Sequence, residues 1–113
     1  MDRQYDLIWA VVDRDFADEA MTAARAAGAR GGTIVFARGS GSKDTEPFFG
    51  VKLVSSKEIL LIVVEREVRA AVMQAIYKKA GGPGVGNAVA FTLPVEDVIG
   101  IGGAYQTDDP AAR

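Results

Sequence analysis

The chain has 113 residues, of which 49 % are hydrophobic and 25 % charged, and its formal net charge is −2. This length and composition are typical of a single globular domain, and the scattered basic residues create no field for nucleic acid, so no nucleic-acid partner is expected. The chain contains neither cysteine nor histidine, which removes the usual zinc and copper ligands and the usual general base at neutral pH.

The amino-acid composition also bears on the localisation of the protein and on its cofactors. No apolar run approaches the about 20 residues that span a bilayer, and the first residues show no signal-peptide pattern. The lack of cysteine also fits a reducing compartment, so we expect a cytoplasmic protein. The acidic residues show no spacing typical of a metal-binding loop. We therefore expect no metal site and no required cofactor.

The first third of the chain predicts a strand, a helix and a second strand. Residues 5–12 are apolar except for Asp6, alanines follow at helical spacing, and residues 32–36 are again mostly apolar. Asp13 or Asp15 is expected to cap the helix, and Gly28 to end it.

The same order returns in residues 58–93. Residues 59–64 are apolar at every position, which is typical of a strand whose sheet is covered on both faces. Because two helices can cover only one face of a four-stranded sheet, the other face is expected to pack against further subunits. A single apolar strand at an edge is the alternative interpretation.

Two successive βαβ units predict an α+β fold. The expected architecture is a ferredoxin-like βαββαβ sandwich, with an antiparallel four-stranded sheet, two helices on one face and trimer formation through the sheets. One domain over residues 1–105 would be followed by a flexible C-terminal tail at 106–113.

Two segments lie outside the repeated core. Residues 39–56 form a central loop that contains Phe48 and Phe49; these phenylalanines would either fold back onto the domain or contact a partner. We expect residues 41–56 of this loop to be the most mobile part of the free protein. Residues 81–87 carry four glycines and a proline, and they form either a backbone nest for an anion or a simple connector.

Two stretches of the sequence resemble the PII nitrogen-regulatory protein family. Gly-Thr-Ile-Val-Phe-Ala-Arg-Gly-Ser-Gly at 32–41 looks like the second strand and loop base of that family, and residues 86–101 resemble its nucleotide loop and the strand after it. The similarity covers about residues 5–102 in uninterrupted order. It implies a homotrimer that binds adenine nucleotides between subunits and reports their presence through the central loop.

The resemblance also implies a set of ligand-binding residues. The nucleoside side would be lined by Thr33, Gly39, Gly41 and Val63. Residues 81–87 would be the equivalent of the nucleotide loop, and the phosphate would face Gly86, Asn87 and Ala88. Phe48 and Phe49 would contact the regulated partner, which in relatives of this shape is often a membrane transporter or a metabolic enzyme.

Departures from the family pattern bear on the ligand. Val89 replaces a phosphate-binding lysine, Gly100 and Gly102 replace two arginines, and the shorter central loop has no tyrosine to modify. The nearest substitute contacts are Arg38 at the loop base and Lys43 or Lys52 in the loop. Losing these contacts favours AMP or ADP over ATP, or another small anion.

The sequence therefore predicts a small-molecule sensor that is not an enzyme and has no catalytic residues. Two alternatives remain open: a ligand-free structural trimer, and a small ferredoxin-fold enzyme. With histidine and cysteine absent, Arg38 and Asn87 are the only catalytic candidates near glycine-rich backbone.

Overall fold

The computed structural model describes residues 4–39, 47–48, 51–52 and 55–101. Its elements follow in the order β1 (Tyr5–Asp13), α1 (Ala17–Ala26), β2 (Thr33–Gly39), β3 (Pro47–Phe48), β4 (Val51–Lys52), β5 (Ser55–Glu65), the 3-10 turn η1 (Arg66–Val68), α2 (Arg69–Ala80) and β6 (Ala88–Val95). The main sheet has the order β2-β5-β1-β6 and is antiparallel throughout. The predicted ferredoxin-like fold is confirmed.

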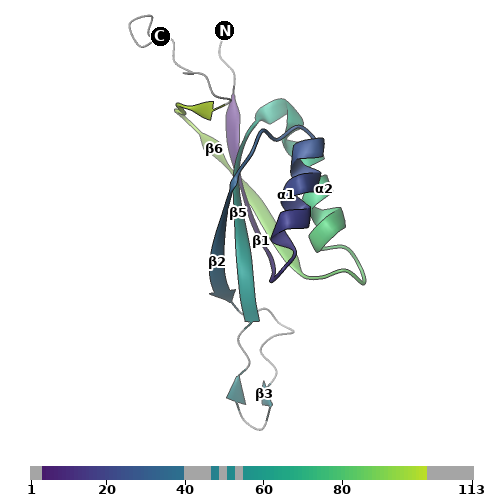
Figure 1. The fold of residues 1–113 in the computed structure, drawn as a ribbon. Helices are drawn as coiled ribbons and strands as arrows, with labels where there is room; N and C mark the ends of the chain where they lie inside the picture. Colours follow the sequence, from purple (N-terminus) through teal and green to yellow (C-terminus); the bar gives the residue numbers. More distant parts are fainter. Residues whose placement is uncertain (1–3, 40–46, 49–50, 53–54, 102–113) are drawn as a thin grey trace, which may run out of the picture.

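The molecule has two layers, because both helices pack on the same face of the main sheet (Figure 1). Alternate residues of the central strands point toward the helices and are fully buried. The largest of these apolar core side chains are Ile8, Val12, Leu60, Ile62, Val72 and Ile76. Small alanines on α1, including Ala20 and Ala24, allow that helix to lie close to its neighbours.

The first helix is not capped as the sequence predicted. Its N-cap position is Phe16, and neither Asp13 nor Asp15 provides a capping hydrogen bond. Instead Glu58 of β5 accepts hydrogen bonds from the backbone N–H groups of Asp15 (2.8 Å) and Ala17 (3.3 Å). A carboxylate brought from a distant strand thus satisfies donors that local residues leave unpaired.

Glycines end both helices, as expected. Gly28 follows the C-cap residue Ala27 and has a φ of 125°, a conformation that residues with a side chain rarely adopt. Gly81 is the C-cap of α2.

The strand β5 begins at Ser55, ahead of the apolar run that predicted it. Residues 55–58 are polar or charged, yet they pair with residues 36–39 of β2. Ladder hydrogen bonds use backbone groups, so they extend where the side chains no longer signal a strand. The central loop is correspondingly shorter than residues 39–56, and part of it forms the small hairpin of β3 and β4.

The second face of the main sheet carries no helix (Figure 1). Strand register places one set of alternate side chains on this open sheet face. Its apolar members are Leu7, Trp9, Val11, Val35, Ile59, Leu61, Val63, Val89, Phe91 and Leu93. Trp9 and Phe91 stack across the β1–β6 pair, with ring centroids 5.9 Å apart. An apolar surface of this extent is typical of a protein interface, as the uninterrupted apolar run in β5 led us to expect.

Candidate functional site

The structure brings two of the predicted nucleoside-side residues together. Thr33 of β2 and Val63 of β5 line one hollow of about 660 Å³ on the open sheet face. The other residues that line it are Arg30, Gly31, Gly32, Leu61, Gly100 and Ile101. Most of these side chains are small or apolar, which suits an uncharged, flat group such as a nucleobase.

Gly100 closes this hollow at a position where the resemblance places an arginine. Its φ is 84°, and a Cβ added there would meet nothing within 4 Å. The space is therefore open, but the backbone conformation favours glycine over any residue with a side chain. The position that lacks the arginine therefore also has a backbone conformation that favours glycine. Gly102 lies outside the described residues.

The predicted phosphate-facing residues lie at the other edge of the sheet. Gly86 and Asn87 lead into β6, and Ala88 begins it, whereas Thr33 lies on β2. Since the strand order is β2-β5-β1-β6, two strands separate these halves within one chain. A single protomer does not bring the predicted site together.

The backbone near Gly86 is tightly packed. A Cβ added at Gly86 would lie 2.5 Å from Cε2 of Phe16 and 2.9 Å from the carbonyl oxygen of Ala80. The last turn of the glycine-rich loop is therefore held against α1 and the end of α2. Gly84 has a φ of 77°, a left-handed conformation that an anion-binding backbone nest can use. The turn that follows it is fixed by packing.

The Asn87 N–H group already has an anionic partner. It donates a hydrogen bond to Oδ2 of Asp13 at 2.9 Å, and Lys57 Nζ donates to Oδ1 of the same carboxylate at 2.6 Å. A phosphate reaching this loop would meet the negative charge of Asp13. This cluster could not be predicted from the sequence, because Lys57 precedes the apolar run and Asp13 suggested a helix cap.

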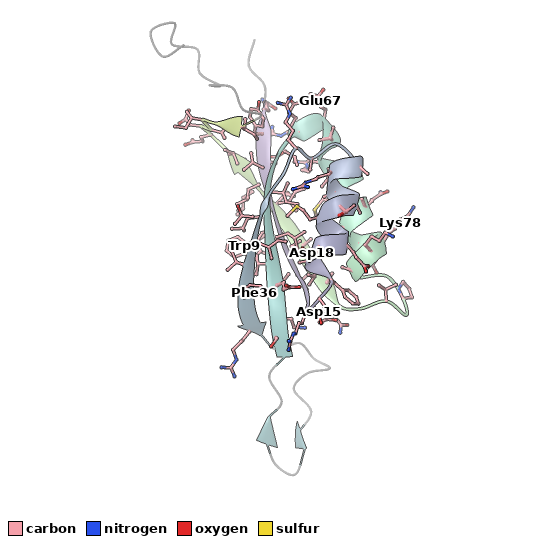
Figure 2. The ribbon with its side chains drawn as sticks, in the orientation of Figure 1. Trp9, Asp15, Asp18, Phe36, Glu67 and Lys78 are labelled. Atoms are coloured by element: carbon pink, nitrogen blue, oxygen red, sulfur yellow. The ribbon has the colours of Figure 1, made fainter. Side chains whose placement is uncertain are left out.

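Arg38 does not line the same hollow as Thr33. Successive side chains of a strand alternate between faces, so Arg38 lies on the face opposite to Thr33. It lines a separate hollow of about 470 Å³ together with Arg14, Asp15, Phe36, Ala37, Ser56, Lys57 and Glu58. Phe36 is 82 % exposed there, beyond the reach of the helices (Figure 2).

Other predicted site residues remain untested. Gly39 ends β2 opposite Ser55. Gly41 and Phe49 lie outside the described residues, as does the tail at 106–113, and of Phe48 only the backbone, in β3, is described. Their roles stay predictions.

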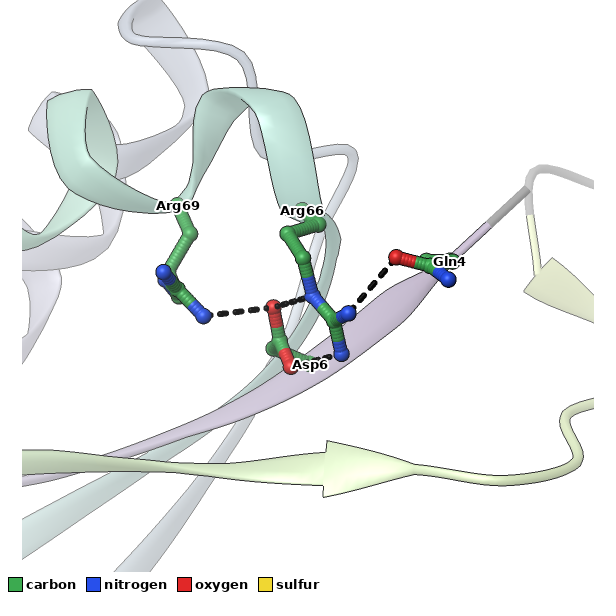
Figure 3. Close-up of polar contacts among 4 residues, drawn as sticks. All are labelled: Gln4, Asp6, Arg66 and Arg69. Carbon is green, nitrogen blue, oxygen red and sulfur yellow. Dashed lines mark hydrogen bonds and ion pairs between the residues drawn. The ribbon is translucent and has the colours of Figure 1, made fainter.

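A second ionic cluster lies where β1 begins (Figure 3). The side chain of Asp6, 2 % exposed, accepts hydrogen bonds from Nε and Nη2 of Arg66, both at 2.9 Å, and from Nη1 of Arg69 at 3.0 Å. Arg66 also donates to the side-chain oxygen of Gln4. The hydrogen bonds from Arg66 outweigh desolvation and hold the pKa of Asp6 below its ordinary value. This cluster ties β1 to the start of α2.

Among the described residues, no group of acidic side chains is arranged to hold a metal ion. No helix in the described part of the chain is long and apolar enough to cross a membrane.

Comparison with known proteins identifies the family. The profile of the nitrogen regulatory protein P-II family matches residues 5–104. The chain belongs to the P-II family. No curated protein sequence matches it.

Solved structures agree with this assignment. Arabidopsis thaliana PII bound to citrate is similar to this P-II family chain with a TM-score of 0.66 and 26 % identity, over 87 % of this chain and 81 % of the plant protein. A Bacillus cereus protein related to NIF3 also gives a TM-score of 0.66, but at 12 % identity it shows only the shared fold. That match covers 84 % of this chain and 26 % of the Bacillus protein.

Proposed function

We propose that this protein is a P-II-type sensor that forms a homotrimer through the open sheet face and binds a small ligand in clefts between subunits. The observation that carries the proposal is the separation of the predicted site. Thr33 and Val63 lie toward the β2 edge, whereas Gly86 and Asn87 lie at the β6 edge. A cleft between the β2 edge of one protomer and the β6 edge of its neighbour would unite both halves.

The charges near these residues favour a ligand with little phosphate. Among the described residues that line the Thr33 hollow, the cationic side chain is Arg30. Its guanidinium lies 3.6 Å from the Glu65 carboxylate. At the other edge Asp13 places a negative charge beside Asn87. We therefore expect AMP or ADP to bind more tightly than ATP. A small carboxylic acid is a second ligand class, in line with the citrate in the Arabidopsis protein.

P-II family proteins are regulators rather than enzymes, and the placement of the two catalytic candidates supports the same role here. Asn87 leads into β6, whereas Arg38 lies on β2 at the opposite edge of the sheet, so the two residues do not converge within one protomer. We propose that the central loop transmits the ligand state to a partner through Phe48 and Phe49. A membrane transporter or a metabolic enzyme is the partner class that the family suggests.

Calorimetric titration with AMP, ADP and ATP tests the ligand assignment. We expect AMP or ADP to bind at least about tenfold more tightly than ATP, a difference of about 1.4 kcal/mol. Thr33→Trp should fill the hollow and abolish this binding, while Thr22→Trp, on the exposed surface of α1, should leave it unchanged. Light scattering must show that each variant forms the same oligomer as the wild type, so that blocked binding is not mistaken for lost assembly.

Sub-micromolar ATP binding with a clear preference over AMP would contradict the ligand assignment. A trimer whose thermal stability responds to no nucleotide and no carboxylate would instead support the ligand-free structural alternative.

A further inference from the structure

The carboxylate of Glu58 reaches from β5 to the start of α1. Its Oε1 atom accepts hydrogen bonds from the backbone N–H groups of Asp15 (2.8 Å) and Ala17 (3.3 Å). These two donors flank Phe16, the N-cap residue of α1. Glu58 is only 9 % exposed, and a buried carboxylate is costly unless donors of this kind compensate it. One oxygen atom of β5 therefore holds the backbone on both sides of Phe16.

The turn that Glu58 holds has an unusual backbone conformation. Among the residues that the structure describes, Asp15 is the one other than glycine with a positive φ, 75°. Residues with a side chain rarely adopt this left-handed conformation, although aspartate tolerates it better than most. Such a conformation persists where contacts from the rest of the fold determine it. The hydrogen bond from the Asp15 N–H group to Glu58 is a contact of this kind.

The ring of Phe16 connects this turn to the glycine-rich loop. A Cβ added at Gly86 would lie 2.5 Å from Cε2 of Phe16, so the ring lies directly against the backbone of the loop. Gly86 and the next residue, Asn87, both belong to the predicted phosphate-facing residues. The position of the ring therefore sets how closely the backbone at Gly86 approaches α1.

Glu58 also lies at the base of the central loop. It is the fourth residue of β5, which begins at Ser55, and it pairs with Phe36 of β2. It lines the hollow of about 470 Å³ at this end of the sheet. A movement of the first residues of β5 would therefore move the oxygen atom that holds Phe16.

We propose that Glu58 is a positioning residue that links the base of the central loop to the glycine-rich loop through Phe16. Glu58 fixes the turn, the turn fixes the ring, and the ring fixes the backbone at Gly86. Because coupling between two sites is reciprocal, a ligand that moves the backbone at Gly86 or Asn87 also acts on the first residues of β5. This inference rests on the proposed sensor function, and it names the route by which ligand binding reaches the central loop.

Hydrogen–deuterium exchange of the backbone amides tests this route. Glu58→Ala removes the acceptor, and we expect the amides of residues 84–88 to exchange at least about tenfold faster than in the wild type. Glu58→Gln keeps a side-chain oxygen that can accept both hydrogen bonds, so it should restore exchange to within about threefold of the wild-type rate. Glu19→Ala, which removes an exposed carboxylate from the first turn of α1, should leave the rate unchanged.

A change at Phe16 tests the middle of the route. Phe16→Leu keeps the backbone donors for Glu58 but shortens the side chain that lies against Gly86, so it should also speed exchange at residues 84–88. Because both changes interrupt one route, the double variant should exchange no more than about threefold faster than the faster single variant. Should Glu58→Ala fail to fold, Phe16→Leu alone is decisive, since reciprocity requires faster exchange at residues 56–58 as well.

Three exchange results would overturn the proposal. The first is equal acceleration at residues 84–88 and in the core strand β1, which would mean that Glu58→Ala only lowers global stability. The second is no acceleration at residues 84–88. The third is a double variant in which the two accelerations multiply, because this would show two independent effects.

Ligand affinity gives the functional result. Glu58→Ala should bind AMP and ADP at least about tenfold more weakly than the wild type, whereas Glu58→Gln should keep the wild-type affinity. Unchanged affinity in Glu58→Ala would overturn the link to the ligand. Glu58, Phe16 and Gly86 belong to one protomer, so the exchange result is independent of nucleotide binding. A wild type that binds no nucleotide would contradict the ligand assignment, and the exchange result would still decide the positioning role.

Discussion

Two aspartates of β1 show how one residue type takes different roles on the two faces of a strand. Asp6 faces the helices and is held by Arg66 and Arg69. Asp13 lies at the other end of β1, on the open sheet face, and is held by Lys57. The side chain of Asp6 is 2 % exposed, so its ion pairs join β1 to the start of α2 inside the fold. The side chain of Asp13 is 28 % exposed and lies nearer to solvent.

The tie at Asp6 predicts a defined pH dependence. Its pKa is lower in the folded state than in the unfolded chain, where it is about 3.9. The ion pair therefore stabilises the fold fully above about pH 4, and this contribution is lost as the pH falls through the lowered folded pKa. Asp6→Asn should lower the free energy of unfolding by roughly 1–3 kcal/mol at pH 7.

Urea unfolding at pH 7 and below pH 4 measures this effect. The difference between wild type and Asp6→Asn should shrink in acid, and Asp18→Asn, which loses an exposed carboxylate, should behave as the wild type at both pH values. A difference that stays constant with pH would mean that the charge of Asp6 does not contribute.

At the scale of elements, the loop between α2 and β6 is fixed by packing as well as by hydrogen bonds. Gly86 lies against the ring of Phe16 and the carbonyl of Ala80, and the next residue bonds to Asp13. The ring of Phe16 comes from the N-cap of α1. The conformation of the loop is therefore coupled to the first helix.

Substitution of Gly86 tests this coupling. Gly86→Ala should lower the free energy of unfolding by about 1–3 kcal/mol, because one of the clashing atoms belongs to the backbone and cannot rotate away. Gly31→Ala is the matched control, since a Cβ there would meet nothing within 4 Å, and it should change stability by less than about 0.5 kcal/mol. Equal effects of the two substitutions, measured by urea unfolding, would show that the loop yields freely.

Elements with a strong pattern could be predicted from the sequence, and contacts between distant residues could not. The run at 59–64 predicted a strand, which lies within β5, and Gly28 marked a helix end. Glu58 and Lys57 escaped prediction because their partners, Ala17 and Asp13, lie more than forty residues earlier in the chain. No local periodicity records such a pairing.

Some features of the candidate site could be predicted from the sequence, and others could not. Thr33 and Val63 meet, since neighbouring strands bring them together, but Arg38 lies on the other face because strand alternation reverses its direction. The engagement of Asn87 by Asp13 depends on the register of β1 against β6. That register is a property of the sheet, which the sequence of either strand alone does not specify.

At the scale of the whole molecule, the open sheet face and the divided site lead to the same assembly. The face carries the stacked rings of Trp9 and Phe91, and Phe91 is 45 % exposed in the isolated chain. Uniting the two halves of the predicted site would take an edge from each of two protomers. A trimer built through the open sheet face would cover the rings and complete three clefts.

The molar mass of the protein in solution tests this account most directly. Multi-angle light scattering at micromolar concentration should give about three times the 11.9 kDa mass of one chain. Phe91→Arg should reduce the mass, because a guanidinium on the open sheet face cannot be buried without a partner, whereas Phe36→Arg, on the opposite face, should leave the trimer intact. A wild-type protein that elutes as a monomer near 11.9 kDa would contradict both the covered face and the shared ligand cleft.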